Sequence, residues 1–308
     1  MRQVYRRAPV RFNRDETTAF LAAIFAVVLW GAMPVLRNQA DAVPALQMAA
    51  IALVCAAAVE FVRGRLVEGR PAETGTPVPW VRLGGLAVAL VGAIAFYFLA
   101  LELAPAAQVT LVTYTWPLMF VSASEILTRG RVRSVVLAGG AVAFAGCGTL
   151  VLGDAGPAGA GLRTIPGYLL GLLSGGCWVV YSLLLRHGPT LGPGAWPRVF
   201  LLGAGAALAL HLLAEPTLWP LPLDALAISA AIGIGPYGLA FVAWAYGVRR
   251  GPARSVGLLA YAVPLVASAL LIALGASEPG WPFAVGTLAV LSGVALANAN
   301  LGGNAKQA

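Results

Sequence analysis

The chain has 308 residues, of which 59% are hydrophobic and only 10% are charged, and its mean hydropathy is +0.84. A soluble domain carries roughly 25% charged residues, so this composition excludes a soluble globular protein and indicates a polytopic membrane protein. The formal net charge of +8 does not indicate nucleic-acid binding, because the basic residues lie in short segments between apolar runs.

Apolar runs long enough to cross a bilayer predict an all-α protein with ten membrane-spanning helices. The first run is longer than the core of a cleavable signal peptide and lacks its small-residue cleavage site, so we interpret it as a retained helix. We expect residues 1–16 to form a basic N-terminal tail and residues 302–308 a C-terminal tail. In chain order, the helices are expected at residues 17–37, 42–62, 80–101, 105–128, 134–153, 165–186, 195–213, 221–248, 252–275 and 281–301.

The basic residues fix the expected orientation of these helices. With the N-terminus inside, all 20 Lys and Arg residues except Arg37 and Arg163 fall on the inner side. Short cytoplasmic loops carry such an excess of Lys and Arg. Both termini are therefore predicted to be cytoplasmic, in a multi-pass protein of the bacterial inner membrane.

The segment from Pro105 to Pro117 has a counterpart 147 positions later, from Pro252 to Pro264. Both copies keep two prolines and a tyrosine, Tyr114 or Tyr261, in register. Self-similarity at this scale indicates that the chain consists of homologous units. Further matches pair Trp30 with Trp178, Gly139 with Gly286, and Gly146 with Gly293.

These matches predict two halves of five helices each, residues 17–153 and residues 165–301. Because five is an odd number, the second half must enter the membrane from the opposite side. The halves are therefore predicted to be inverted repeats around a central cavity, the arrangement found in many transporters.

The eighth expected helix contains an unusual group of helix-weakening residues. Proline removes a backbone donor and glycine loosens the turn, so a kink is expected there. Such a break at membrane depth persists only where it lines a cavity or is covered by protein. The residues concerned are Gly233, Gly235, Pro236 and Gly238.

No motif of a soluble enzyme, such as HExxH or GxSxG, is found, and we expect neither catalytic activity nor a metal site or cofactor. The three cysteines, Cys55, Cys147 and Cys177, lie in apolar runs without metal-site spacing and are interpreted as small core residues. His211 is interpreted as a hydrogen-bonded interfacial residue near the outer end of its helix, with a proton-relay role as the minor alternative.

Acidic residues at mid-membrane would indicate ion coupling, but none is expected there. Glu60, Glu102 and Glu125 all fall near predicted helix ends. Glu125 faces the basic loop of residues 129–133, and we expect it to form a structural ion pair at the inner surface.

Aromatic residues provide the remaining functional signal. Tyr and Trp normally concentrate at the membrane interfaces, yet many lie deep within the expected helices of this chain. Their N–H and O–H groups need partners there, which a polar cavity would supply, and their rings can stack on a flat substrate. Ordinary core packing remains the alternative for any one of them. The candidate substrate-binding residues are Trp30, Tyr97, Tyr114, Trp116, Trp178, Tyr181, Tyr237, Trp244 and Tyr261.

At these residues the sequence resembles the drug/metabolite transporter superfamily and its EamA-type ten-helix members. The resemblance is carried by Trp30, Trp178, the two proline-bounded segments and Glu125, and it extends over about residues 17–301. Tyr114-Thr115-Trp116-Pro117 and the pair Trp178 and Tyr181 are similar to the YddG-type aromatic amino-acid exporters. The resemblance implies a central cavity lined mainly by helices 1, 3, 4, 6, 8 and 9, alternating access, and export of aromatic amino acids with some tolerance for other substrates.

The expected function is facilitated, uncoupled export of aromatic and other neutral amino acids. The alternative is a proton-coupled multidrug exporter of flat aromatic cations such as methyl viologen, which would favour a carboxylate in the cavity. A sugar-phosphate exchanger would need basic residues in the cavity, and an intramembrane enzyme would need a catalytic pair at depth. The expected partners are a small-molecule substrate and the lipid bilayer, without nucleic acid, and a monomer is favoured over a stable oligomer.

Overall fold

The computed structural model describes residues 14–67, 78–153, 164–278 and 280–299, and these residues form helices and connecting turns without any strand. The helices of the first part of the chain are α1 (Arg14–Gly31), α2 (Met33–Asn38), α3 (Ala45–Val67), α4 (Trp80–Leu103), α5 (Ala106–Thr113), α6 (Trp116–Arg129) and α7 (Ser134–Leu152). Those of the second part are α8 (Ile165–His187), α9 (Ala195–Ala214), α10 (Leu223–Ile232), the π-helical segment η3 (Gly233–Leu239), α11 (Ala240–Arg250), α12 (Ala253–Leu259), α13 (Ala262–Ala273) and α14 (Trp281–Asn298).

Nine stretches among the described residues are long and apolar enough to cross a membrane. They correspond to nine of the ten expected helices, so the chain is a multi-pass, all-helical membrane protein. The remaining expected helix, the fourth in chain order at residues 105–128, is built from the shorter helices α5 and α6, with an interruption at Tyr114 and Thr115.

Several expected boundaries differ from the structure. The described part of α1 starts at Arg14, inside the expected tail of residues 1–16, and Asp15 and Glu16 in its first turn interact favourably with the helix dipole. The first expected span is divided into α1 and α2 just before Pro34, which cannot donate a backbone hydrogen bond. The second ends at Val67 rather than residue 62, and the last ends at Asn298. The expected C-terminal tail lies outside the described residues.

The two proline-bounded segments fold alike. Pro105 precedes α5 and Pro252 precedes α12, each as the N-cap residue. Helix α5 then gives way to α6 around Tyr114, and α12 gives way to α13 around Tyr261. In both cases a proline follows three residues later and leaves one backbone carbonyl without its helical N–H partner.

The break expected near Pro236 is confirmed. There the chain forms the π-helical turn η3 between α10 and α11, with Pro236 inside it. Single π-helical turns of this kind are frequent at functional sites. A Cβ atom on Gly233 would lie 2.3 Å from the carbonyl oxygen of Ala52, so glycine allows η3 to pack directly on α3.

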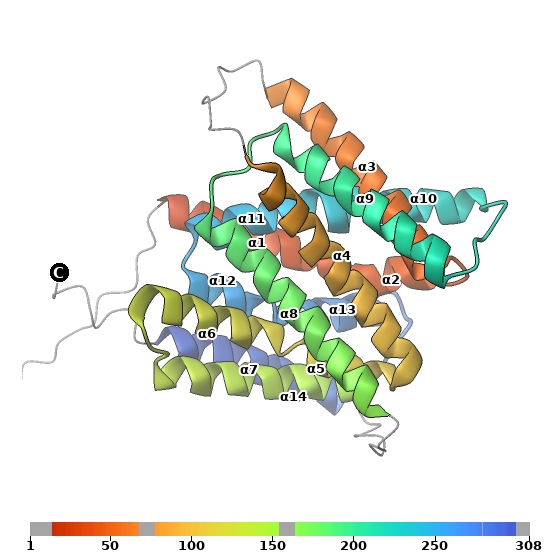
Figure 1. Cartoon of the computed structure of the whole chain (residues 1–308). Helices are drawn as coiled ribbons and strands as arrows, with labels where there is room; N and C mark the ends of the chain where they lie inside the picture. Colours follow the sequence, from red (N-terminus) through yellow and green to blue (C-terminus); the bar gives the residue numbers. More distant parts are fainter. Residues whose placement is uncertain (1–13, 68–77, 154–163, 279, 300–308) are drawn as a thin grey trace, which may run out of the picture.

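Helix pairs from the two parts of the chain form the layers of the molecule. Helix α7 lies beside α14 at one side, and α3 lies beside α9 at the other (Figure 1). Between them, α4 packs on α8, and α11 packs on α1.

Helices α7 and α14 approach closely through glycines. A Cβ atom on Gly139 would lie 2.6 Å from the carbonyl oxygen of Gly293, and one on Gly146 would lie 2.8 Å from that of Gly286. The same clashes arise from the other helix, where a Cβ atom on Gly293 or Gly286 would meet the carbonyl oxygen of Gly139 or Gly146. Since the lower-numbered glycine of α7 meets the higher-numbered glycine of α14, the two helices run antiparallel.

Candidate functional site

A cluster of aromatic side chains joins four spans in the middle of the molecule. Trp30 comes from α1, Trp116 from α6, Trp178 from α8 and Trp244 from α11. The centroids of the Trp30 and Trp178 rings are 6.1 Å apart, and those of Trp30 and Trp244 are 5.2 Å apart. Trp116 completes the group, since its ring centroid lies 6.2 Å from that of Trp178 and 5.7 Å from that of Trp244.

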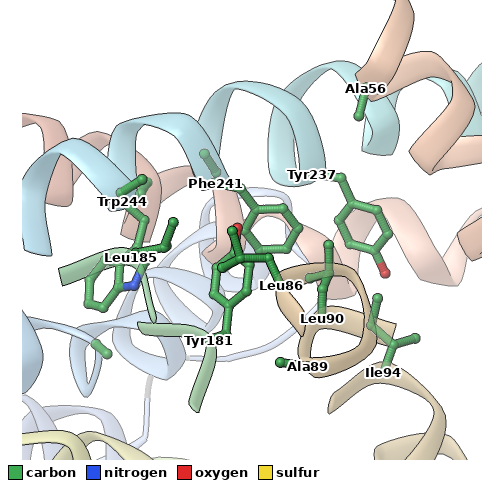
Figure 2. Close-up of a cluster of buried hydrophobic side chains, with 14 of the residues drawn as sticks. Ala56, Leu86, Ala89, Leu90, Ile94, Tyr181, Leu185, Tyr237, Phe241 and Trp244 are labelled. Atoms are coloured by element: carbon green, nitrogen blue, oxygen red, sulfur yellow. The ribbon is translucent and has the colours of Figure 1, made fainter. Parts of the chain in front are cut away.

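Tyr181 and Tyr237 extend this aromatic cluster. Tyr181 meets Trp178 edge to face with a centroid distance of 6.0 Å, and both Tyr181 and Trp244 are fully buried. Tyr237 lies in η3 and reaches the cluster through Phe241. Figure 2 shows Tyr181 and Phe241 between Trp244 on one side and Tyr237 on the other, beside Leu86 and Leu90 of α4.

Phe241 is the residue that sequence reasoning missed. Its ring stacks on Tyr237 at 5.5 Å and lies 5.7 Å from both Trp30 and Trp178. Only Trp and Tyr were considered from the sequence, because of their polar groups. Helical spacing would have revealed it, since Phe241 is four residues after Tyr237 and three before Trp244, on one helix face.

The polar groups of the cluster differ in their hydrogen-bond partners. The Trp30 indole Nε1 donates to the carbonyl oxygen of Pro236 at 3.0 Å, so the π-helical turn provides the acceptor. Trp244 Nε1 donates to Ser182 Oγ at 3.2 Å. The Tyr181 hydroxyl is buried and has no hydrogen-bond partner among the described residues. The cluster therefore holds an unused donor and acceptor at its centre.

Three of the nine expected residues lie outside the aromatic cluster. The Tyr97 hydroxyl is 2.7 Å from Thr110 Oγ1, and its ring contacts Phe98. Tyr261 packs against Phe144 at a centroid distance of 6.3 Å. Tyr114 is the C-cap residue of α5, at the break before α6. The structure thus brings together six of the nine residues.

A network of charges lies at the end of the molecule that carries the α6–α7 connection and the α11–α12 connection, here called the basic end. Glu125 Oε1 accepts from Arg133 Nη2 and from Arg254 Nη2, both at 2.9 Å. Glu125 is 6% exposed and Arg254 is 4% exposed. The expected ion pair of Glu125 with its neighbouring loop is confirmed for Arg133. The partner on α12 was not foreseen.

The local fold explains how Arg133 reaches Glu125. Gly130 ends α6 with a φ of 70°, a left-handed conformation that glycine adopts without steric cost. The chain then turns back, so the backbone N–H of Arg133 also donates to Glu125 Oε2 at 3.2 Å. The guanidinium and the backbone N–H of Arg133 therefore both donate to the Glu125 carboxylate.

Arginines also join the ends of α8 and α11 at the basic end. Arg186 donates to the carbonyl oxygens of Val248 and Gly251, and Arg249 donates to those of Leu185 and Gly188. Each guanidinium therefore meets the last carbonyls of the other helix, where the helix dipole favours positive charge.

The arrangement agrees with known proteins. The model of the EamA-like transporter family matches residues 17–152 and, a second time, residues 165–299. The chain belongs to this family. An aromatic amino acid exporter YddG from Ancylobacter novellus is 34% identical over 286 residues, which are 92% of this chain and 98% of that protein. A solved structure described only as "Crystal structure of protein" is 32% identical, with a TM-score of 0.82 over 92% of this chain and 97% of that chain.

In this EamA-like transporter two further carboxylates near helix ends, those of Glu60 and Glu215, have local partners. Glu60 pairs with Arg63 at 2.5 Å. Glu215 accepts from the backbone N–H groups of Leu46 and Gln47, at the start of α3, and from His211 Nδ1 at 2.9 Å. His211 is thus part of a hydrogen-bonded cap between α9 and α3. Within the described ranges, no group of three or more His, Cys, Asp and Glu residues could hold a metal ion.

Two hollows lie away from the aromatic cluster. One, of about 300 Å³, lies between α1, α12, α13 and α14, and the other, of about 400 Å³, lies beside α3 and Leu239. None of the nine expected residues lines either hollow. The six clustered residues pack on one another, and Trp30 and Trp178 stay only partly buried. The central cavity stays a prediction.

Proposed function

We propose that this chain exports aromatic and other neutral amino acids across the bacterial inner membrane by alternating access, without coupling to an ion gradient. The observation that carries the proposal is the aromatic cluster, in which the repeat-related Trp30 and Trp178 meet at 6.1 Å. The relative from Ancylobacter novellus, named as an aromatic amino acid exporter, supports the substrate class.

The aromatic cluster suits a flat substrate, whose ring can take the place of one of the protein's rings. An aromatic pair contributes only about 0.5–1.5 kcal/mol beyond the burial of its surface, so exchanging one ring contact for another costs little. The Tyr181 hydroxyl, which has no partner among the described residues, is then available to the polar end of an amino acid. We assign the six clustered residues to stacking on the substrate. We assign Tyr97, Tyr114 and Tyr261 to the substrate path on either side of the aromatic cluster.

Alternating access follows from the proposed repeat. We infer two inverted five-helix repeats, residues 17–153 and 165–301, that surround the substrate path as ten spans. The reciprocal contacts of α7 and α14 support this inference. Gly139 meets Gly293, and their respective repeat partners, Gly286 and Gly146, meet in the same way. A two-fold relation between the helices accounts for such a self-complementary contact.

The proposed orientation places both tails, residues 1–16 and 302–308, in the cytoplasm, and we propose a monomer as the working unit. The charge pattern supports this orientation, because only Arg37 and Arg163 fall on the outer side. Reporter fusions test it. A periplasmic reporter placed after residue 70 should be inactive, and activity there would overturn the inverted repeat.

The alternative, a proton-coupled multidrug exporter, would use a free carboxylate in the substrate path. Glu60 and Glu125 are instead paired with arginines, and none of the six clustered residues is acidic. This distribution favours a zwitterionic substrate, which brings no net charge into the membrane.

Transport into proteoliposomes separates the two functions. The panel contains labelled phenylalanine, tryptophan, leucine and methyl viologen, each at equal concentration. We expect phenylalanine and tryptophan to enter fastest and methyl viologen to enter no faster than into protein-free liposomes. Rapid methyl viologen transport without amino-acid transport would establish the alternative.

A further inference from the structure

The proposed repeat allows every contact at the basic end to be compared with its equivalent at the opposite end. Helix α6 packs on α12 at the basic end. The repeat equivalents of these two helices are α13 and α5, at the opposite end, and no comparable contact joins them in the part of the chain described. Helices α8 and α11 likewise pack together, while α4 makes no comparable contact with α1 or α2, which are the equivalents.

We propose that the Glu125–Arg254 ion pair is a latch that holds the basic end closed and sets the resting conformation of the transporter. This inference rests on the proposed alternating access. The orientation proposed above makes the basic end the cytoplasmic one, so the latched state faces outward.

The hydrogen bonds show where the latch opens. Glu125 is held within the first repeat by Arg133, and Arg254 is held within the second repeat by the carbonyl oxygen of Ala297 at 2.8 Å. Among the hydrogen bonds of the described residues, the one from Arg254 Nη2 to Glu125 Oε1 crosses from α12 to α6. When that bond breaks, each charge keeps a polar partner, so the separated state avoids the large cost of an isolated buried charge.

Helices α6 and α12 pack closely around the Glu125–Arg254 pair, and this packing defines the closed state. A Cβ atom on Gly257 of α12 would lie 2.5 Å from Val121 and 2.8 Å from Phe120 of α6. The two helices therefore meet directly beside the ion pair, which is shielded from water. A charge pair gains strength in such a low-dielectric site.

The latch has no polar counterpart at the opposite end. The repeat equivalent of Glu125 is Ile272, and that of Arg254 is Ala107. These two positions therefore cannot form an equivalent ion pair at the opposite end. In a carrier whose two states are related by the exchange of repeats, this difference favours the state that is closed at the basic end.

Spin-label distances measured in nanodiscs test the latch without any substrate. Cys55, Cys147 and Cys177 are first replaced by alanine. One label pair, Arg129→Cys with Ala253→Cys, flanks the latch. Its repeat equivalent, Ala276→Cys with Ala106→Cys, reports on the opposite end. We expect a single short distance for the first pair and a longer one for the second.

The variant Arg254→Met should raise the population with a long latch distance at least about tenfold, and it should shorten the distance at the opposite end. Glu125→Gln should act in the same direction and serves as a second variant if the first does not fold. Arg131→Met, at an exposed arginine of the same connection, is the matched control and should leave both distances unchanged.

Unchanged distances in the folded Arg254→Met or Glu125→Gln protein would overturn the latch. A predominantly long latch distance in the labelled parent chain would overturn it as well. Because no substrate is involved, a shift in distance without amino-acid transport would support the latch and reject the proposed substrate class instead.

Discussion

Trp178 is the residue on which the proposed substrate stacking depends most. It contacts Trp30, Trp116, Tyr181 and Phe241, which come from three other parts of the chain as well as its own helix. We expect Trp178→Ala to weaken aromatic substrate binding by about 1–3 kcal/mol, because a stacking face and an indole donor are lost. Phenylalanine flux into proteoliposomes measures this effect. Trp281→Ala, at the exposed start of α14, is the control, and normal flux in Trp178→Ala would show that Trp178 only fills the core.

Ser182 supports the cluster through a single hydrogen bond to Trp244. In Ser182→Ala the indole N–H stays buried without this acceptor, which should lower stability by about 1–3 kcal/mol. Thermal unfolding in detergent should register the loss, whereas Ser277→Ala, at an exposed bend, should unfold like the parent. Equal unfolding temperatures for all three proteins would mean that this hydrogen bond contributes nothing measurable.

The sequence predicted the aromatic residues better than their arrangement. Depth within an apolar run identified Trp30, Trp178 and Trp244, because an aromatic side chain far from the interface needs a reason to be there. Helical spacing puts Phe241 on one face with Tyr237 and Trp244, but it could not show that Phe241 meets Trp30 and Trp178, nor that Arg254 reaches Glu125. These contacts join residues far apart in the chain, and they depend on how the helices pack.

Helices α7 and α14 form the most closely packed pair, and glycine makes their approach possible. Small residues let backbones come together in a membrane, where packing rather than water drives association. We expect Gly139→Ala to destabilise the protein by about 1–3 kcal/mol, because its Cβ atom would lie 2.5 Å from the backbone nitrogen of Ala297.

Gly205→Ala provides the control for this substitution. Gly205 also lies within a membrane helix, but a Cβ atom there would have no neighbour within 4 Å. Its unfolding temperature should match that of the parent or exceed it slightly, since alanine favours helix. If Gly139→Ala were as stable as Gly205→Ala, the two helices would not be in tight contact.

At the level of elements, the sequence predicted one of the interruptions of the spans and missed others. Pro236 among glycines indicated a break in the eighth span, and it appears as the turn η3. The helices of the two proline-bounded segments, each expected as one span, are interrupted around Tyr114 and Tyr261. The division of the first span after Gly31 was missed, because a single proline near a helix end gives a weaker signal.

For the whole molecule, composition alone was enough to establish a multi-pass membrane protein. The expected central cavity stays a prediction, while the ion pair at the basic end joins α6 to α12 in the described structure. Composition and charge carry no information about which state of an alternating-access cycle is favoured. That depends on unequal contacts at the two ends, such as the pair Glu125 and Arg254.

The central claim, uncoupled export of aromatic amino acids, is tested most directly by efflux from proteoliposomes preloaded with labelled phenylalanine. The measurement compares efflux with equal pH on both sides and with an imposed pH difference of either sign. We predict efflux down the phenylalanine gradient at the same rate in all three cases, because no free carboxylate or histidine contacts the aromatic cluster in the described structure. Accumulation of phenylalanine against its gradient, driven by the pH difference, would contradict the account.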